Sequence, residues 1–386
     1  MNRLLLVVVF PFAATGLGAQ IIPVSGGGAA LANAVASAPD GAVLVVAPGT
    51  YDPFSAAQRH LTLVAPQRAT IRFFLGTTAP ALLTVIGISA AQPFRMVGFD
   101  VLQAYAPGYP YPSYGVISCR DAHLEECTCQ GILTWGGVLL VARCTVTAVA
   151  GSAVGSASGS QGSVVLVDST FWGGYVTTPL GIPQGSAPGI GLSAFKLRAE
   201  RIQVQTVTFA SQSGPAVALS DYSGVPCTAT IADSVLIPGW PTVAGASIAC
   251  TPATTLTVSG TQTPGGITCA YATTPLATLR WLVRQWTPGG TSALRSQHLP
   301  ATLAIAVVSL SAVPFTSPLI AEQSFVGANP DWFVHAFGVS NALGEFDWNL
   351  TLPPSPSLQY AEAWLHGVSM PGPPLHVSTP LGGLIR

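Results

Sequence analysis

Charged residues are scarce in this chain of 386 residues: Asp, Glu, Lys and Arg together make up 8% of it, and the formal net charge is −1. Lysine occurs only once, as Lys196. A chain so poor in basic residues offers no positively charged surface to nucleic acid or to anionic lipid. The composition therefore argues against nucleic acid as a partner.

Motifs for metal and cofactor binding are also missing. The six histidines are scattered without metal-ligand spacing, and the seven cysteines form no C-x-x-C pair that could supply structural zinc ligands. No G-x-S-x-G motif is present to position a nucleophilic serine. We therefore expect neither a metal nor a cofactor.

Helical periodicity is nearly absent, and a short pattern recurs instead. Its six copies begin at residues 96, 124, 141, 166, 204 and 231, and four of them read LEECTCQG, VARCTVTA, LVDSTFWG and VQTVTFAS. The spacing of the copies centres on the length of one solenoid coil. The chain therefore reads as a stack of coils, with loops where the gaps are long.

Two apolar columns emerge when the copies are aligned on an anchor, which is Cys127 in the second copy. Three residues before the anchor stand Met96, Leu124, Val141, Leu166, Val204 and Ile231. Two residues after it stand Val101, Cys129, Val146, Phe171, Phe209 and Leu236. Both columns alternate with period two, but their phase slips by one residue between them, which requires a bend. The residue before the anchor is Gly98, Glu126, Arg143, Asp168, Thr206 or Asp233, and Gly and Asp suit a left-handed backbone. Each copy thus predicts two short strands that meet at a corner.

The pattern resembles the right-handed parallel β-helix of the pectate-lyase-like superfamily, whose coils carry apolar pairs around an inward bend. The stretch LANAVASAPDGAVLVVAPGTY at 31–51 is similar to that family's N-terminal cap helix, turn and first strand. This resemblance implies an all-β fold, a right-handed parallel β-helix (solenoid) with an N-terminal cap helix. It implies little about function, because the same scaffold carries lyases, hydrolases and non-catalytic surface proteins.

Sequence character divides the chain into three segments. Residues 1–19 combine one arginine, an apolar run and small residues before Gln20, which predicts a secretory signal peptide, with an uncleaved anchor as the alternative. Residues 20–265 form the predicted β-helix. Residues 275–386 contain strand-like runs between Pro and Gly turns and predict a small β-sandwich domain. We expect a secreted or cell-surface protein with no transmembrane segment after removal of the signal.

An exported chain with seven cysteines predicts disulfides. Cys127 and Cys144 share the anchor position of successive coils, and neighbouring parallel strands lie about 4.8 Å apart, within the Cα separation that a disulfide tolerates. A disulfide between Cys127 and Cys144 is therefore one prediction. A ladder of two buried thiols is an equally good interpretation.

Aromatic side chains in loops suggest a carbohydrate partner. The segment AYAPGYPYPSYG at 104–115 carries Tyr105, Tyr109, Tyr111 and Tyr114 among prolines, and Trp172 stands beside a second long loop. Rigid exposed rings bind sugars well, because a pyranose face stacks on a ring at little entropic cost. A loop that packs its own tyrosines is the alternative. We expect a polysaccharide or cell-surface glycan as the partner of a structural or binding module.

Catalysis is the competing hypothesis. A polysaccharide lyase needs a base and cations around a uronate carboxylate. The only concentrated candidates are Lys196, Arg198, Glu200 and Arg201, the first three alternating on one face of a predicted strand. The alternative function is therefore a polysaccharide lyase or glycoside hydrolase acting on an acidic polysaccharide, and the bland interpretation is a solvated strand face with internal ion pairs.

Overall fold

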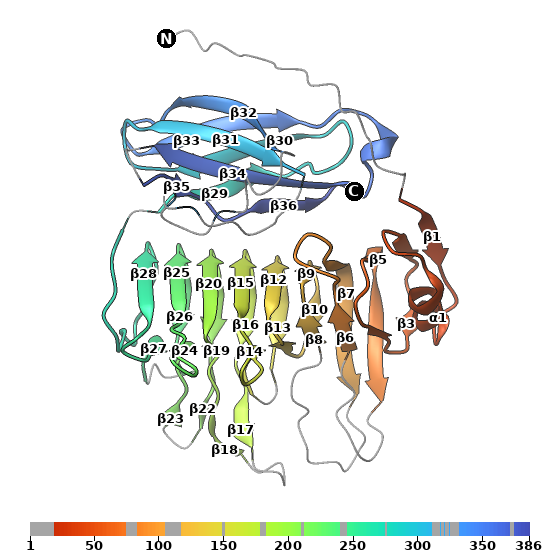
Figure 1. Cartoon of the computed structure of the whole chain (residues 1–386), viewed down its shortest axis with the longest axis horizontal. Coiled ribbons are helices and arrows are strands. Elements are labelled where there is room, and N and C mark those ends of the chain that lie inside the picture. Colours follow the sequence, from red (N-terminus) through yellow and green to blue (C-terminus); the bar gives the residue numbers. More distant parts are fainter. Residues whose placement is uncertain are drawn as a thin grey trace. The chain divides into compact units, whose positions relative to one another are not determined.

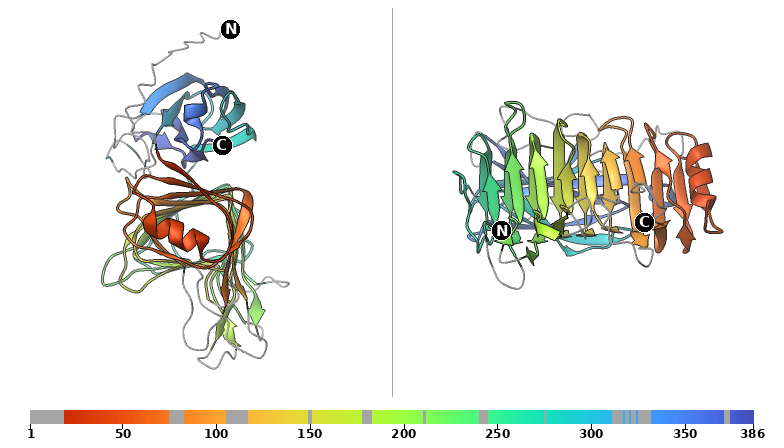
Figure 2. Two further views of the ribbon diagram at one scale, coloured as in Figure 1. Left: turned by 90° about the vertical axis from the view of Figure 1, so that its right-hand side faces the viewer. Right: turned by 90° about the horizontal axis from the view of Figure 1, so that it is seen from below.

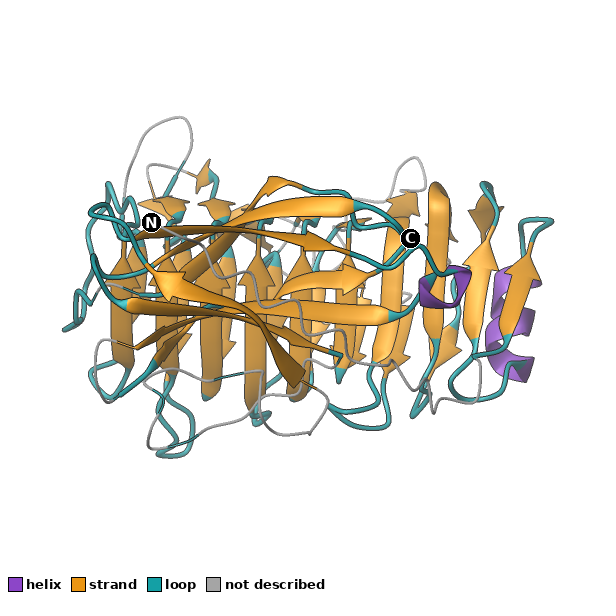
Figure 3. Ribbon diagram, turned by 90° about the horizontal axis from the view of Figure 1, so that it is seen from above, coloured by secondary structure: helices purple, strands orange, loops and turns teal. Residues whose placement is uncertain are grey.

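The computed structural model describes residues 19–74, 83–104, 117–148, 151–177, 183–209, 212–239, 245–274, 276–310, 317, 320, 324, 332–370 and 374–386. The described chain separates into two compact units, Ala19–Thr273 and Thr274–Arg386. Strands dominate both units (Figures 1 and 3). The predicted signal peptide stays a prediction, because residues 1–18 lie outside the described residues.

The first unit is a right-handed parallel β-helix, as predicted. Each coil passes through three rows of parallel strands, which form the sides of a three-sided column (Figure 2, left). The first row comprises β4 (Ser55–Ala56), β6 (Leu83–Ile86), β8 (Ile117–Arg120), β11 (Ile132–Thr134), β14 (Val154–Ser156), β19 (Ile190–Ser193), β24 (Val217–Ser220) and β27 (Ile248–Cys250). The second row comprises β9 (Ala122–Glu125), β12 (Gly137–Ala142), β15 (Gly162–Val167), β20 (Phe195–Glu200), β25 (Thr228–Ala232) and β28 (Thr255–Ser259). The third row comprises β10 (Thr128–Cys129), β13 (Thr145–Thr147), β16 (Thr170–Trp172), β21 (Gln203–Gln205) and β26 (Val235–Ile237).

Longer and shorter strands complete the column. The long strands β5 (Thr62–Phe74) and β7 (Phe94–Ala104) run through both the second and the third rows. Strands β1 (Ile21–Val24), β2 (Val43–Val46) and β3 (Thr50–Tyr51) lie at the N-terminal end. Two antiparallel hairpins leave the column, β17 (Tyr175–Thr177) with β18 (Pro183–Ser186) and β22 (Thr208–Phe209) with β23 (Gln212–Ser213).

The apolar columns predicted from the sequence fill the interior, with one correction. Leu124 pairs in register with Met96 and Val141, and Val141 pairs with Leu166. The next member is Ala199 rather than Val204, and Ile231 follows it. Val204 instead continues the other column, between Phe171 and Leu236, where the prediction had Phe209. Phe209 lies in hairpin strand β22.

The corners between the second and third rows use a left-handed backbone at one residue per coil. That residue is Arg68, Gly98, Glu126, Arg143, Asp168, Arg201, Asp233 or Gly260, each with φ between 48° and 79°. Thr206, predicted in this column, is replaced by Arg201. The prediction failed there because Arg rarely adopts this conformation and gives no signal of its own. From Glu126 to Asp233 the side-chain charge alternates in sign from coil to coil.

Where the anchor residue that follows a corner is polar, its side chain satisfies backbone groups in the core. The Cys144 N–H donates to Ser169 Oγ over 3.0 Å, and the Ile202 N–H donates to Ser234 Oγ over 3.2 Å. The Ser169 hydroxyl in turn donates to the carbonyl of Val167 over 2.7 Å. A polar side chain at an anchor therefore accepts a hydrogen bond from a buried amide of the preceding coil, one that has no partner in the strand pairing.

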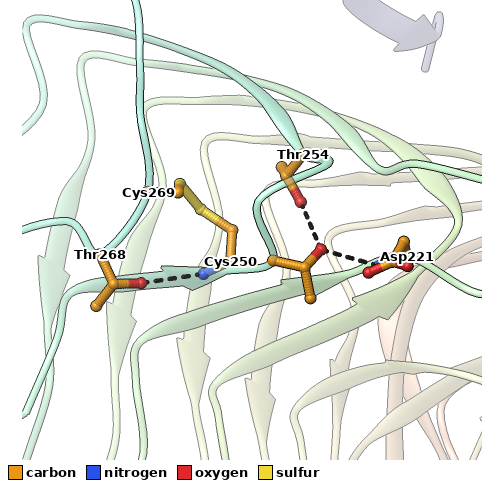
Figure 4. The surroundings of a disulfide bond; sticks show 6 residues. Asp221, Cys250, Thr254, Thr268 and Cys269 are labelled. Carbon is orange, nitrogen blue, oxygen red and sulfur yellow. Dashed lines mark hydrogen bonds between the residues drawn. A yellow bond between two sulfur atoms is a disulfide. The ribbon is translucent and has the colours of Figure 1, made fainter.

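Both ends of the column are closed. Helix α1 (Ala30–Ser37) buries Leu31 and Val35 across the N-terminal end (Figure 2, left). At the other end, residues 260–272 add bridges to the last strands, and a disulfide joins Cys250 to Cys269 over a Cα separation of 5.7 Å (Figure 4). Closed ends protect a solenoid from pairing end to end with other chains.

The second unit contains two antiparallel sheets. One is β29 (Thr278–Val283), β30 (Thr291–Gln297) and β33 (Glu345–Thr351); the other is β31 (Leu303–Ser309), β32 (Trp332–Val339), β34 (Glu362–Met370), β35 (His376–Val377) and β36 (Leu381–Leu384). A short 3-10 helix, η1 (Pro356–Leu358), precedes β34. The sheets approach closely, because a Cβ added at Gly338 would lie 2.7 Å from the Phe346 ring.

In the part of the chain that the structure describes, no helix is long and apolar enough to cross a membrane.

Candidate functional site

The predicted catalytic strand alternates as the sequence indicates. In β20, Leu197 and Ala199 face the core, so Lys196, Arg198 and Glu200 occupy the outer positions. Lys196 is exposed, whereas Arg198 and Glu200 retain only 4% and 1% of their accessible surface. The three side chains therefore do not present one open charged face.

Arg201 belongs to an ion-pair cluster at the corner. Its guanidinium donates to Asp168 over 2.6 Å and contacts Glu200 directly. Burial by itself would lower the pKa of Arg201, but the negative charges of Glu200 and Asp168 outweigh burial and raise that pKa above its ordinary value. Arg143, two coils earlier, pairs in the same way with Glu125 and Glu126. These contacts stabilise the corners. They also engage Glu200, the carboxylate of the predicted set that a lyase would need as its base.

The predicted disulfide between Cys127 and Cys144 is wrong. Both residues are buried free thiols, and the Cys127 N–H donates to Cys144 Sγ over 3.3 Å. Burial and the thiol of Cys127 raise the pKa of Cys144. Cys127 and Cys144 thus form the buried thiol ladder, which the sequence analysis gave as an equally good interpretation. At its anchor, Cys144 accepts a hydrogen bond from a buried amide, as Ser169 does in the next coil.

The predicted aromatic residues divide into two groups. Tyr105, Tyr109, Tyr111 and Tyr114 lie outside the described residues. Trp172 is half-buried on the outer side of β16, with Thr147 and Gln205 as its register neighbours. A half-buried aromatic ring on a rigid sheet can stack on a sugar, and the neighbouring Thr147 hydroxyl can bind a sugar hydroxyl group, whereas Gln205 is buried.

Trp135 was missed in the sequence and is an exposed aromatic residue of the β-helix whose ring is held by a hydrogen bond. It lies where the first row turns into the second, and it is 51% exposed. Its Nε1–H donates to Ser118 Oγ over 2.7 Å, which fixes the plane of the indole. Arg120, whose side chain is 58% exposed, follows the register partner of Thr134 and occupies the equivalent place one coil earlier. The string Trp-Gly-Gly at 135–137, an aromatic residue at a sharp bend, is the signal that could have found it.

An open cavity of about 520 Å³ lies further along the same corner. It is lined by Gln161, Gly162, Ser163, Ala194, Phe195, Lys196, Val225, Pro226 and Thr228. The Trp135 bend adjoins this cavity, since a Cβ added at Gly136 would lie 2.6 Å from the Gln161 carbonyl oxygen. Of the four predicted catalytic residues, only Lys196 lines the cavity.

Comparisons with known proteins show no family. No family model and no curated protein match the chain. Among solved structures, the full-length tailspike protein 2 of Escherichia coli O157:H7 bacteriophage CAB120 is 10% identical with a TM-score of 0.28, over 92% of this chain and 65% of the tailspike. The enzymatically active domain of tailspike protein 2 of bacteriophage CBA120 is 10% identical with a TM-score of 0.23, over 92% of this chain and 73% of the domain. This chain spans less than two thirds of the full-length tailspike, and TM-scores this low carry no argument about function.

Proposed function

We propose that this protein is an exported β-helix module that binds a polysaccharide or cell-surface glycan. The observation that carries the proposal is Trp135, a half-exposed indole fixed by Ser118 on a rigid coil, with the donors of Arg120 beside it. Such a surface stacks on the apolar face of a sugar ring and binds its hydroxyl groups with little loss of side-chain entropy. Trp172 and the tyrosines of residues 104–115 would extend this surface.

Export and architecture form part of the same proposal. The apolar N-terminal segment supports secretion, and the disulfide between Cys250 and Cys269 supports an oxidising compartment. The cap helix and the corner pattern support membership of the pectate-lyase-like superfamily. The two antiparallel sheets of the second unit support a C-terminal β-sandwich domain.

Binding is favoured over catalysis by the ion pairs. Glu200 and Arg201 contact each other, and Arg198 is buried, so Lys196 is the member of the predicted set that a substrate reaches. A lyase or hydrolase acting on an acidic polysaccharide is the second candidate, and Lys196 at the cavity is the observation that favours it.

Affinity electrophoresis on a panel of neutral and acidic polysaccharides tests the proposal. We expect Trp135→Ala to weaken retention about tenfold, equivalent to roughly 1.4 kcal/mol of lost stacking. The matched control is Tyr271→Ala, because Tyr271 is 50% exposed and lies near the C-terminal end of the β-helix. Retention of no polymer by the wild-type protein, or equal retention by Trp135→Ala, would refute the proposal.

Two further arms complete this experiment. Changing Tyr109 and Tyr111 to Ala should weaken retention without lowering thermal stability, whereas Lys196→Ala with Arg198→Ala should leave neutral polymers bound. Absorbance of unsaturated products and reducing-end assays are run alongside. Release of products from an acidic polymer, abolished by the basic double variant, would replace binding with the lyase or hydrolase function.

A further inference from the structure

The cavity beside Lys196 arises because three successive coils turn the same corner differently. The middle coil passes from β19 to β20 through one residue, Ala194, at a φ of 57°. The coil before it uses residues 157–161 for this turn, and the coil after it uses residues 221–227. Residues of the two longer turns, Gln161 in one and Val225 and Pro226 in the other, form the walls of the cavity on either side of Ala194.

Both walls are fixed by their own hydrogen bonds. Tyr222 and Val225 exchange backbone hydrogen bonds of 3.1 and 2.9 Å around Ser223 and Gly224, which both have positive φ. In the opposite wall, the Ser160 N–H donates to the Ala157 carbonyl over 3.2 Å. The cavity is therefore present before any ligand arrives, so binding needs little ordering of the protein.

The chemistry of the lining is uneven. Lys196 is the only charged residue among the lining residues. Ser163 and Thr228 are its register neighbours, and the amide of Gln161 adds a further polar group. Val225 and Pro226 supply an apolar wall, and Ala194 and Phe195, whose side chain is buried in the core, complete the lining. One positive charge thus lies among uncharged lining residues; Asp221, the first residue of the turn after β24, is not one of them.

The charge of Lys196 has no counterion among the described residues. Arg68, Arg143 and Arg201 each contact a carboxylate, but Lys196 makes no ion pair with any residue that the structure describes. A cation that the fold does not neutralise, placed at the wall of a preformed cavity, is free to attract an anionic group.

We propose that this cavity binds a small ligand that joins one anionic group, a carboxylate, to a short apolar body. The carboxylate pairs with the Lys196 ammonium and accepts hydrogen bonds from the neighbouring hydroxyl and amide groups, while the apolar body packs on Val225 and Pro226. The cavity volume of about 520 Å³ falls in the usual range for small-molecule sites, about 300 to 1,000 Å³. The ligand is either a free organic acid or an acyl substituent with a carboxylate end on a glycan that stacks on Trp135.

Isothermal titration calorimetry on the full mature chain tests the first half of this inference with cinnamate and its neutral isostere cinnamamide. Cinnamate should bind at least about tenfold more tightly than cinnamamide, and its affinity should fall with added salt. Lys196→Met should abolish that preference while leaving cinnamamide unchanged, and Lys196→Arg should keep it. Arg72→Met, which removes an exposed charge from the third row, is the matched control and should behave as wild type. Equal binding of acid and amide, unaltered cinnamate binding by Lys196→Met, or no binding of cinnamate up to about 10 mM would each overturn the inference.

The second half is tested with acids of increasing apolar length. Affinity should rise from acetate to hexanoate to cinnamate, and equal affinities would disprove a role for the apolar wall. A glycan carrying succinyl half-esters, compared with the same glycan after saponification, separates the two sources of the carboxylate. A preference for the esterified glycan that Trp135→Ala reduces identifies a glycan substituent as the ligand, whereas binding of the free acids alone identifies a small organic acid. Binding of the free acids does not require the glycan-binding proposal, so each can fail without the other.

Discussion

Replacing Arg201 by Leu should destabilise the β-helix more than any single change at an exposed ion pair. The side chain of Glu200 is 2% exposed and contacts Arg201, whose own side chain is 17% exposed. Removing one partner of a buried pair typically costs about 3 to 5 kcal/mol, because the charge that stays buried loses attraction that offset its desolvation. Asp168 is 26% exposed and regains water, so we expect a loss near the lower end, about 3 kcal/mol.

Guanidinium unfolding followed by tryptophan fluorescence measures this loss, since Trp135 and Trp172 both lie in the β-helix. The control is Arg120→Leu, because Arg120 is 58% exposed and meets Asp121 at 3.6 Å, so its loss should stay below about 1 kcal/mol. The double variant Glu200→Gln, Arg201→Leu should recover part of the stability, since no buried charge remains at position 200. Equal losses for Arg201→Leu and Arg120→Leu, or strictly additive losses in the double variant, would refute the argument.

Three further changes have predictable results. Replacing Cys250 and Cys269 by Ser opens a link between residues 19 apart and should lower the free energy of unfolding by about 3 kcal/mol, measured by urea unfolding; a variant as stable as the oxidised wild type would contradict this. The hydrogen bond from Arg68 lowers the pKa of Asp100 below 3.8, so its contribution is present above that pH and is lost as the pH falls through the lowered pKa. Arg68 also donates to the Glu126 carbonyl and to Thr128 Oγ1. Arg68→Gln should therefore be less stable than wild type at pH 7 by under about 1 kcal/mol, and the difference should shrink in acid once Asp100 is protonated; a difference independent of pH would be unexpected. Leu166→Ala should cost about 2 to 5 kcal/mol by thermal or urea unfolding, unless the coil collapses around the hole.

The repeat could be predicted from the sequence because burial imposes it on every coil. Leu124, Val141 and Leu166 lie at the same distance from the bend and must be apolar, so the requirement is visible at single positions of the sequence. The register failed in the coil that contains Arg201, where neither the left-handed residue nor the anchor Ile202 has a distinctive identity. Val204 is apolar and fits either column, so only the pairing of β16 with β21 decides between them.

The candidate site was harder to foresee for a geometric reason. The cavity exists only because a turn of one residue, Ala194, lies between two longer turns. The lengths of these turns can be read from the sequence only when all three coils have been assigned correctly. Trp135 stands alone in sequence, whereas the predicted aromatic loop attracts attention through its four tyrosines. Lys196 was singled out as a charge within a cluster, and the structure places it in the cavity lining without its neighbours.

The acceptor in each of the anchor hydrogen bonds lies one coil further along the chain, so the order of synthesis decides when the bond can form. The amide of Cys144 needs the hydroxyl of Ser169, and the amide of Ile202 needs that of Ser234, so both of these coils are completed by a residue synthesised later. During translation, each of these two amides stays unpaired until the next coil emerges. A chain cut short before Ser169 or before Ser234 therefore leaves a buried amide without its acceptor, whereas the loss of coils before Cys144 leaves these two hydrogen bonds intact.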